Sequence, residues 1–187
     1  SKKLLEKYGE DSSILMNHAN HKVCGVEHST GALGHGLPVG VGKAMVAKMN
    51  NLQWKTFVLL SDGEMQEGSN WEAIMFAAHH KLDNLVAIVD YNNLQSLGSV
   101  DKILNINPLK KKIASFGWNV KEVEGHNHEM LEETLTLAKN QKGAPTVVIA
   151  HTTKGKGVAY MENNIKWHYR TPNYKEYIEA MNEIKSA

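Results

Sequence analysis

The sequence of 187 residues has little of several features that mark particular classes of protein. Its one cysteine, Cys24, cannot form an intrachain disulfide, and a single thiol excludes a zinc site built from several cysteines. A reducing, cytoplasmic setting is therefore expected. Neither sign of charge dominates, because 21 Lys and Arg stand against 20 Asp and Glu, so we expect no basic surface for nucleic acid.

Long hydrophobic runs and the familiar phosphate-binding motifs are also absent. The longest apolar runs span about five residues, whereas a helix that crosses a membrane needs about 20, and the amino terminus begins no signal-peptide core. Gly42-Lys43 is followed by Ala44, which excludes a P-loop, and a G-x-G-x-x-G pattern that starts at Gly40 has Met45 in place of its third glycine. We expect a chain that binds neither a membrane nor nucleic acid.

What the chain does contain is an alternation of short apolar runs and longer amphipathic segments. Unbroken apolar runs are typical of strands covered on both faces, as in parallel sheets. They predict strands over residues 56–60, 85–89 and 145–150, and a weaker pattern predicts one nearer an edge over 118–123. Helices are predicted over residues 37–49, 69–82, 129–140 and 174–186, with a short first helix near 3–8. This order predicts a three-layer, doubly wound α/β domain with a mainly parallel sheet over residues 1–187.

Two details of this prediction concern the start of the second long helix and the start of the chain. Ser69 and Glu72 have the spacing of a capping box, and Trp71, Ile74 and Met75 are expected on one apolar face of the helix that follows, with Ala78. The first predicted helix leads into a loop with no preceding strand. We therefore expect that a leading segment of the domain is absent from this sequence.

Polar residues follow two of the predicted strands where each strand ends. Asp62-Gly63 comes directly after the run that ends at Leu60, and Asn92 comes after the run that ends at Val89. Ligands of open parallel sheets bind beyond the carboxyl ends of the strands, so Asp62 and Asn92 are expected to be neighbours. One carboxylate and one carboxamide are a good partial shell for Mg²⁺ on a diphosphate. The alternative is that both dipeptides, Asp62-Gly63 and Asn92-Asn93, are merely turns.

Ten histidines are many for this length, and four of them lie within residues 18–35. His18 and His21 have a spacing that suits zinc, but no third ligand of fixed spacing follows. The alternative interpretation is that these histidines have no functional role and are ordinary surface and core residues of a histidine-rich chain. His21 and His35 stay unassigned.

The motifs resemble those of thiamine-diphosphate enzymes, and of transketolase in particular. Asp62-Gly63 with Asn92-Asn93 resembles the GDG…NN signature of these enzymes, with Ser61 in place of the first glycine. The stretch EMQEGSNWEA at residues 64–73 is similar to transketolase in a more specific way. GVEHSTGALGHGLPVGVGKAMVAK at 25–48 and HTTKGKGVAYMENNIKWHYRTPN at 151–173 extend the resemblance over nearly the whole chain.

The resemblance implies cofactor and metal roles for matching residues. Asp62, the Asn92 side chain and the Leu94 backbone carbonyl would bind Mg²⁺, for which Ca²⁺ or Mn²⁺ would substitute. Gly63 would contact the diphosphate of thiamine diphosphate. The remaining implied cofactor contacts are Gly31 and Leu33 at the junction of the two rings.

Four further residues are implied by the resemblance to take part in catalysis or in an interface. His18 would contact the donor sugar, and His168 would lie near the diphosphate and the reacting carbon. Histidine suits proton transfer because it titrates near neutral pH. Glu67, placed with the cofactor-binding residues, and Glu72 would belong to the interface glutamates of the family.

The resemblance also implies a partner chain. In split transketolases the diphosphate-binding half and the pyrimidine-binding half are separate polypeptides, and no carboxylate that would activate the aminopyrimidine is found here. The implied enzyme is a heterotetramer of two chains of each kind that transfers a two-carbon glycolaldehyde unit from a ketose phosphate to an aldose phosphate.

Two other hypotheses stay open at this point. The chain could belong to another thiamine-diphosphate enzyme, such as a deoxyxylulose-phosphate synthase or a keto-acid dehydrogenase component. It could also be a non-catalytic module that binds cofactor or a partner. The stretch around Trp71 and the Trp167-His168 pair favour transketolase over the first, and Ser61 is the best support for the second.

Overall fold

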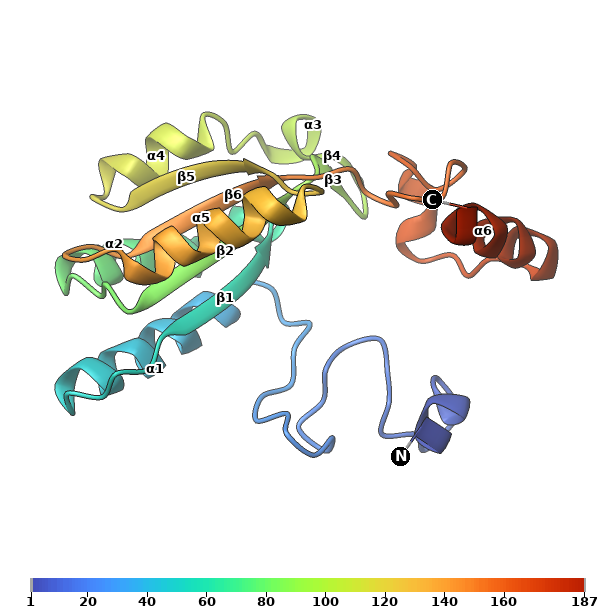
Figure 1. Ribbon diagram of the computed structural model, residues 1–187, viewed down its shortest axis with the longest axis horizontal. Helices are drawn as coiled ribbons and strands as arrows, with labels where there is room; N and C mark the ends of the chain where they lie inside the picture. Colours follow the sequence, from blue (N-terminus) through green and yellow to red (C-terminus); the bar gives the residue numbers. More distant parts are fainter. Residues whose placement is uncertain (1, 187) are drawn as a thin grey trace.

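A computed structural model describes residues 2–186, so Ser1 and Ala187, the ends of the predicted domain, lie outside the described residues. A four-stranded parallel sheet forms its centre (Figure 1). The strands lie in the order β1-β2-β6-β5, with bounds Thr56–Ser61 for β1, Leu85–Tyr91 for β2, Thr146–His151 for β6 and Asn119–Glu124 for β5. Because all pairs are parallel, the carboxyl ends of the four strands meet at one edge.

Helices cover both faces of the sheet, because side chains alternate between faces along each strand. On one face, Leu85, Ala87 and Val89 of β2 pack in a core with the helices α1 (Gly36–Met49), α2 (Gly68–His79) and α4 (Leu109–Ser115). On the other face, Val86 of β2 lies in a smaller cluster with Ala138 of α5 (His128–Asn140). These three layers confirm the predicted α/β class.

The layer formed by α5 covers only part of its face. It contacts β5 and β6, as Figure 1 shows. On the edge strand β1, Phe57 and Leu59 alternate with the buried Val58 and Leu60 and are 46% and 71% exposed. The sheet therefore has an uncovered apolar strip along β1.

Further elements lie beyond the carboxyl ends of the strands. The amino-terminal segment with η1 (Lys2–Lys7) and the terminal helix α6 (Tyr174–Ser186) both stand apart from the sheet on that side (Figure 1). The remaining short elements are η2 (Glu64–Gln66), β3 (Leu94–Gln95), β4 (Gly98–Ser99), α3 (Val100–Leu104) and η3 (Ile165–His168). Within residues 2–186, no helix combines the length and the hydropathy needed to cross a membrane.

The predicted strands and longer helices are all present, and β5 is an edge strand as expected. The sequence patterns missed α3, α4 and the β3–β4 hairpin, which are too short to show a clear period. The predicted capping box is wrong. Helix α2 begins at Gly68 after Glu67, so Ser69 lies within the first turn, and its hydroxyl donates to the carbonyl of Gly34 at 2.6 Å.

The predicted face and end of the same helix also need correction. The apolar residue Met75 is 58% exposed, whereas the polar residue Asn70 is buried and donates from Nδ2 to the carbonyl of Glu64 at 2.7 Å. The buried stripe therefore runs through Asn70, Ala73, Ile74 and Ala77. The helix ends at His79, three residues before the predicted end at Leu82.

Candidate functional site

Two carboxylates lie side by side where β1 and β2 end. Ser61 pairs with Asp90 in the last register position, and the backbone N–H of Asp62 donates to the carbonyl of Asp90 at 3.2 Å. The sheet pairing therefore continues one residue past β1 and holds Asp62 next to the end of β2. This is the position that the sequence predicts for a ligand-binding edge.

Asp62 is a buried carboxylate held by backbone N–H groups. Its side chain accepts hydrogen bonds from the N–H of Gly63 at 2.7 Å and from the N–H of Asn93, and the residue is 1% exposed. Burial raises the pKa of Asp62, and the neighbouring charge of Asp90 raises it further, while the backbone N–H groups oppose both effects. Among residues 2–186, no Lys, Arg or His forms an ion pair with Asp62 or Asp90, so two neighbouring acidic groups lack a cation partner.

Asn92 lies in the turn between β2 and β3, beside this carboxylate. Its Oδ1 accepts from the N–H of Leu94 at 3.0 Å, and its Nδ2 donates to Oδ1 of Asp90 at 3.2 Å. Asn93, between Asn92 and Leu94, has a φ of 62° and donates its N–H to Asp62. The turn thus brings Asn92 next to Asp62, as the strand ends predict, and the Leu94 N–H binds the Asn92 side chain.

The oxygen-rich character of this group fits a hard divalent cation. One carboxylate, one carboxamide and a backbone carbonyl are donors that Mg²⁺ accepts, with the rest of its shell left to phosphate and water. In the described part of the chain, no three His, Cys, Asp or Glu residues are grouped to hold a metal. A site here would therefore depend on the mixed donors of Asp62, Asn92 and Leu94, and a cation would balance the two acidic groups.

Gly63 keeps the backbone beside Asp62 open. A Cβ at this position would lie 3.1 Å from Cβ of Gln95 in β3, which is tighter than ordinary contact. The side-chain oxygen of Ser61, the residue that replaces a glycine of the family signature, accepts from the N–H of Glu64 at 3.0 Å. The hydroxyl of Ser61 is thus turned toward the start of η2.

The loop before α1 places Gly31 against His18. Gly31 has a φ of 104°, and a Cβ there would lie 2.8 Å from Cδ2 of His18, so the backbone of Gly31 packs on the imidazole ring. Leu33, two residues on, is 52% exposed. These two predicted cofactor contacts and His18 therefore belong to one segment. Among the described residues, no hydrogen bond or ring contact joins His18 to Asp62.

The start of α2 anchors this loop to the sheet. Besides the Ser69 bond, the N–H of Gly34 donates to Oε1 of Glu64 at 2.9 Å. A Cβ on Gly34 would meet the side chain of Glu67, so Glu67 lies against the loop. Glu72, the other glutamate implied for the interface, is exposed on α2.

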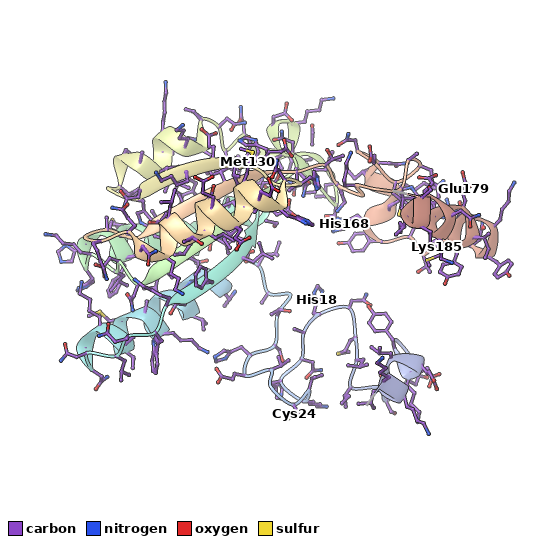
Figure 2. All side chains as sticks on the ribbon, viewed as in Figure 1. His18, Cys24, Met130, His168, Glu179 and Lys185 are labelled. Atoms are coloured by element: carbon purple, nitrogen blue, oxygen red, sulfur yellow. The ribbon has the colours of Figure 1, made fainter. Side chains whose placement is uncertain are left out.

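His168 ends η3, which contacts β3. Figure 2 shows it at the carboxyl ends of the strands, with His18 on the amino-terminal segment beyond. Partial burial lowers the pKa of His168, and the nearby charge of Lys154 lowers it further. Both effects favour the neutral imidazole, which is the form that can accept a proton.

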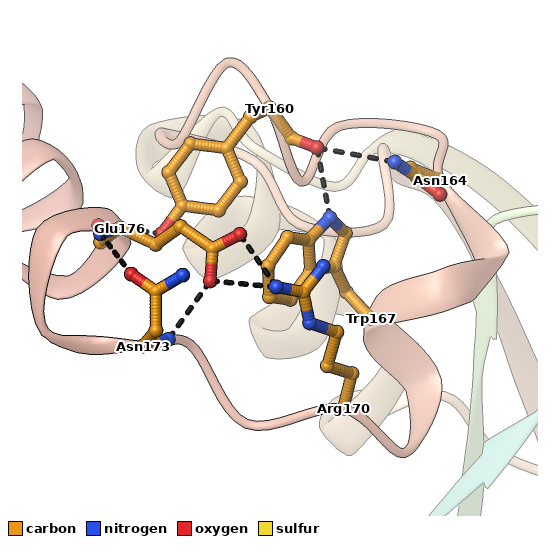
Figure 3. A network of polar contacts seen from close by, with 6 residues as sticks. All are labelled: Tyr160, Asn164, Trp167, Arg170, Asn173 and Glu176. Atoms are coloured by element: carbon orange, nitrogen blue, oxygen red, sulfur yellow. Dashed lines mark hydrogen bonds and ion pairs between the residues drawn. The ribbon is translucent and has the colours of Figure 1, made fainter.

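A polar network fixes the segment that carries His168 (Figure 3). The indole N–H of Trp167 donates to the carbonyl of Tyr160 at 2.9 Å, and Arg170 donates to both carboxylate oxygens of Glu176 at 2.7 and 3.0 Å. Asn173 and Glu176 form a capping box at the start of α6, since each side chain accepts from the other's backbone N–H. The segment before η3, at Tyr160, and the segment after it, at Arg170, are thereby held in place.

The sequence interpretation assigned no role to Asp90 or Thr152. The hydroxyl of Thr152, which follows β6, donates to Oδ1 of Asp90. A usable signal was present, because each residue stands at or just past the end of a predicted strand, as Asp62 does. The partners of the Asp90 carboxylate, however, are Thr152, which lies just after β6, and Asn92, which lies in the turn after β2.

The fold defines a three-layer α/β domain with an acidic group at the carboxyl edge of its sheet, and comparisons with known proteins identify its family. The domain described as "Transketolase, thiamine diphosphate binding domain" matches residues 4–183. The chain belongs to the transketolase family and carries its thiamine diphosphate-binding domain.

Named relatives and a solved structure agree with this assignment. An apulose-4-phosphate transketolase subunit of Phocaeicola vulgatus is 45% identical over 184 residues, 98% of this chain and 66% of the relative. The protein of the same name from Actinobacillus succinogenes is 46% identical over 97% of this chain and 66% of the relative. A transketolase structure from Campylobacter jejuni superposes with a TM-score of 0.93 at 31% identity, covering 99% of this chain and 30% of that one. The chain thus spans about two thirds of these curated relatives.

Proposed function

We propose that this chain is the diphosphate-binding subunit of a two-subunit transketolase, which moves a two-carbon glycolaldehyde unit from a ketose phosphate to an aldose phosphate. Two relatives named as subunits of apulose-4-phosphate transketolase support both the reaction and a separate partner chain. The observation that carries the proposal is the buried Asp62 carboxylate beside Asp90, with no cation partner among residues 2–186, at the edge where a metal-bound diphosphate would lie.

In this proposal Asp62, Asn92 and the Leu94 carbonyl hold Mg²⁺, or Ca²⁺ or Mn²⁺ in its place, on the cofactor diphosphate. Gly63 leaves room for the phosphate because it has no side chain. Gly31 and Leu33 lie against the cofactor rings. Bound thiamine diphosphate supplies the carbon nucleophile that carries the two-carbon unit.

The two histidines and the glutamates complete the proposed site. His168, whose lowered pKa favours the neutral imidazole, accepts a proton at an imidazole nitrogen beside the reacting carbon, and His18 binds the donor sugar. Glu67 and Glu72 contact the pyrimidine-binding partner, which supplies the carboxylate that activates the cofactor. We propose a heterotetramer of two chains of each kind in the cytoplasm.

Thiamine diphosphate binding to the chain co-purified with its pyrimidine-domain partner, measured by calorimetry with Mg²⁺ and with EDTA, tests the metal site. We expect binding that requires Mg²⁺ and is lost in Asp62→Ala, because the only proposed carboxylate ligand is removed. Asp101→Ala is the control, since Asp101 is an exposed aspartate in the first turn of α3. Equal affinity of Asp62→Ala and the parent chain would show that the proposed metal site is wrong.

Co-purification with the pyrimidine-domain partner tests whether the chain is one half of a split enzyme. The mixed chains should transfer a two-carbon unit from a ketose phosphate to an aldose phosphate, and neither chain should do so alone. Activity of this chain by itself would contradict the split-subunit proposal. Cofactor binding without transfer activity in the mixture would favour the non-catalytic alternative.

A further inference from the structure

Asp90 joins three segments at the carboxyl edge of the sheet. It is the last residue but one of β2, and its Oδ1 accepts from Nδ2 of Asn92 at 3.2 Å and from the hydroxyl of Thr152. The backbone N–H of Thr152 also donates to the carbonyl of Tyr91 at 3.2 Å. The end of β6 is therefore fixed to the end of β2 by both a backbone and a side-chain bond.

These bonds decide which end of the Asn92 amide faces which neighbour. An ionised carboxylate accepts hydrogen bonds and cannot donate, so Asp90 selects the NH₂ end of the amide. On the opposite side, the N–H of Leu94 donates at 3.0 Å and selects the oxygen. A flipped amide would place its oxygen against the Asp90 carboxylate and its NH₂ against the Leu94 N–H, which are two repulsive contacts.

The orientation matters because a divalent cation binds the amide through oxygen. The oxygen end of Asn92 lies toward the turn whose next residue, Asn93, donates its N–H to Asp62. We propose that Asp90 and Thr152 act as a positioning pair, in which the Thr152 hydroxyl holds the Asp90 carboxylate and Asp90 holds the Asn92 oxygen toward the metal. This inference rests on the proposed function, because it assigns support to the metal ligands proposed there.

The substitutions that test the pair keep its shape and change its chemistry. Thr152→Val removes the hydroxyl donor but retains a β-branched side chain, and Thr152→Ser restores the donor. Asp90→Asn replaces an acceptor-only group by one that can present NH₂ to Asn92. The matched control is Thr153→Val, because within residues 2–186 no hydrogen bond involves the Thr153 hydroxyl, while its backbone N–H donates to His126.

Mn²⁺ binding to the chain assembled with its pyrimidine-domain partner, followed by electron paramagnetic resonance of the free ion in the presence of saturating thiamine diphosphate, provides the readout. Loss of a residue that orients a metal ligand typically weakens metal affinity about 10- to 100-fold. We expect that loss for Thr152→Val and Asp90→Asn, and near-parental affinity for Thr152→Ser and Thr153→Val. At saturating Mg²⁺, Thr152→Val should bind thiamine diphosphate as tightly as the parent, a recovery that a merely misfolded site would not show.

The outcomes separate this inference from the proposal on which it rests. If the parent chain, assembled with its pyrimidine-domain partner, shows no cofactor-dependent Mn²⁺ binding, the proposed metal site fails and the positioning role fails with it. If the parent binds and Thr152→Val binds equally well, only the positioning role is overturned. Weak binding by Thr152→Val that saturating Mg²⁺ does not restore would also overturn it, because the hydroxyl would then be acting on the general fold.

Discussion

Replacing Gly40 by alanine tests how closely α1 packs on the sheet that carries the site. A Cβ on Gly40 would lie closer than 3.0 Å to Cγ2 of Val58, a separation that real Cβ atoms essentially never show. Val58 is buried on β1, and its β-branched side chain has few rotamers with which to move aside. Gly42, on the same helix, has nothing within 4 Å of its would-be Cβ and is the matched control.

Gly40→Ala and Gly42→Ala both gain helix stability from alanine, but only Gly40→Ala also overpacks the core. Alanine is better than glycine inside a helix by about 0.5–1 kcal/mol, so Gly42→Ala should raise the free energy of unfolding by that amount. Gly40→Ala gains the same term but overpacks the core, which costs about 1–3 kcal/mol. The difference between the variants should therefore be about 1–3 kcal/mol in favour of Gly42→Ala, or about 2–4 °C in Tm for each kcal/mol.

Urea unfolding of the chain, followed by circular dichroism at pH 7, measures these free energies. If Gly40→Ala proves as stable as Gly42→Ala, the close contact between α1 and β1 is refuted. Combining Gly40→Ala with Val58→Ala provides a further check, because removing the Val58 methyl groups makes room for the new Cβ. The double variant should then lose less stability than the sum of the two single variants.

Two further predictions concern the active-site loop and an ion pair. Gly31→Ala and Gly25→Ala both strain the backbone, because both glycines have a positive φ, but only Gly31 packs on His18. Only Gly31→Ala should therefore weaken donor-sugar binding in the assembled enzyme. Equal effects of the two variants on the KM for the donor sugar would refute this. Nζ of Lys110 lies 2.6 Å from Oε2 of Glu122 and lowers the pKa of Glu122. The stabilisation of the fold by this ion pair is therefore present above the usual pKa of Glu122 and is lost as the pH falls through its lowered pKa. Glu122→Gln should therefore reduce unfolding free energy at pH 7, by about 0.2–1 kcal/mol, but not at pH 2; equal losses at both would contradict it.

Local patterns in the sequence were enough for the strands and for the positions of Asp62 and Asn92. The apolar runs before Asp62 and Asn92 predict neighbouring parallel strands, and parallel strands bring their carboxyl ends to one edge. The same kind of reasoning failed at Ser69. Its spacing to Glu72 fits a capping box, but the competing partner, the carbonyl of Gly34, comes from a loop 35 residues away.

The sequence by itself thus determined the α/β class, the carboxyl-edge position of Asp62 and Asn92, and the family resemblance. Only the tertiary structure decided that Asp90 bonds Thr152, 62 residues further along the chain, and that Gly31 packs on His18. The physical reason is that apolar periodicity and strand ends depend on neighbouring residues. Which donor meets which acceptor depends instead on where separate loops converge, and no local pattern records that convergence.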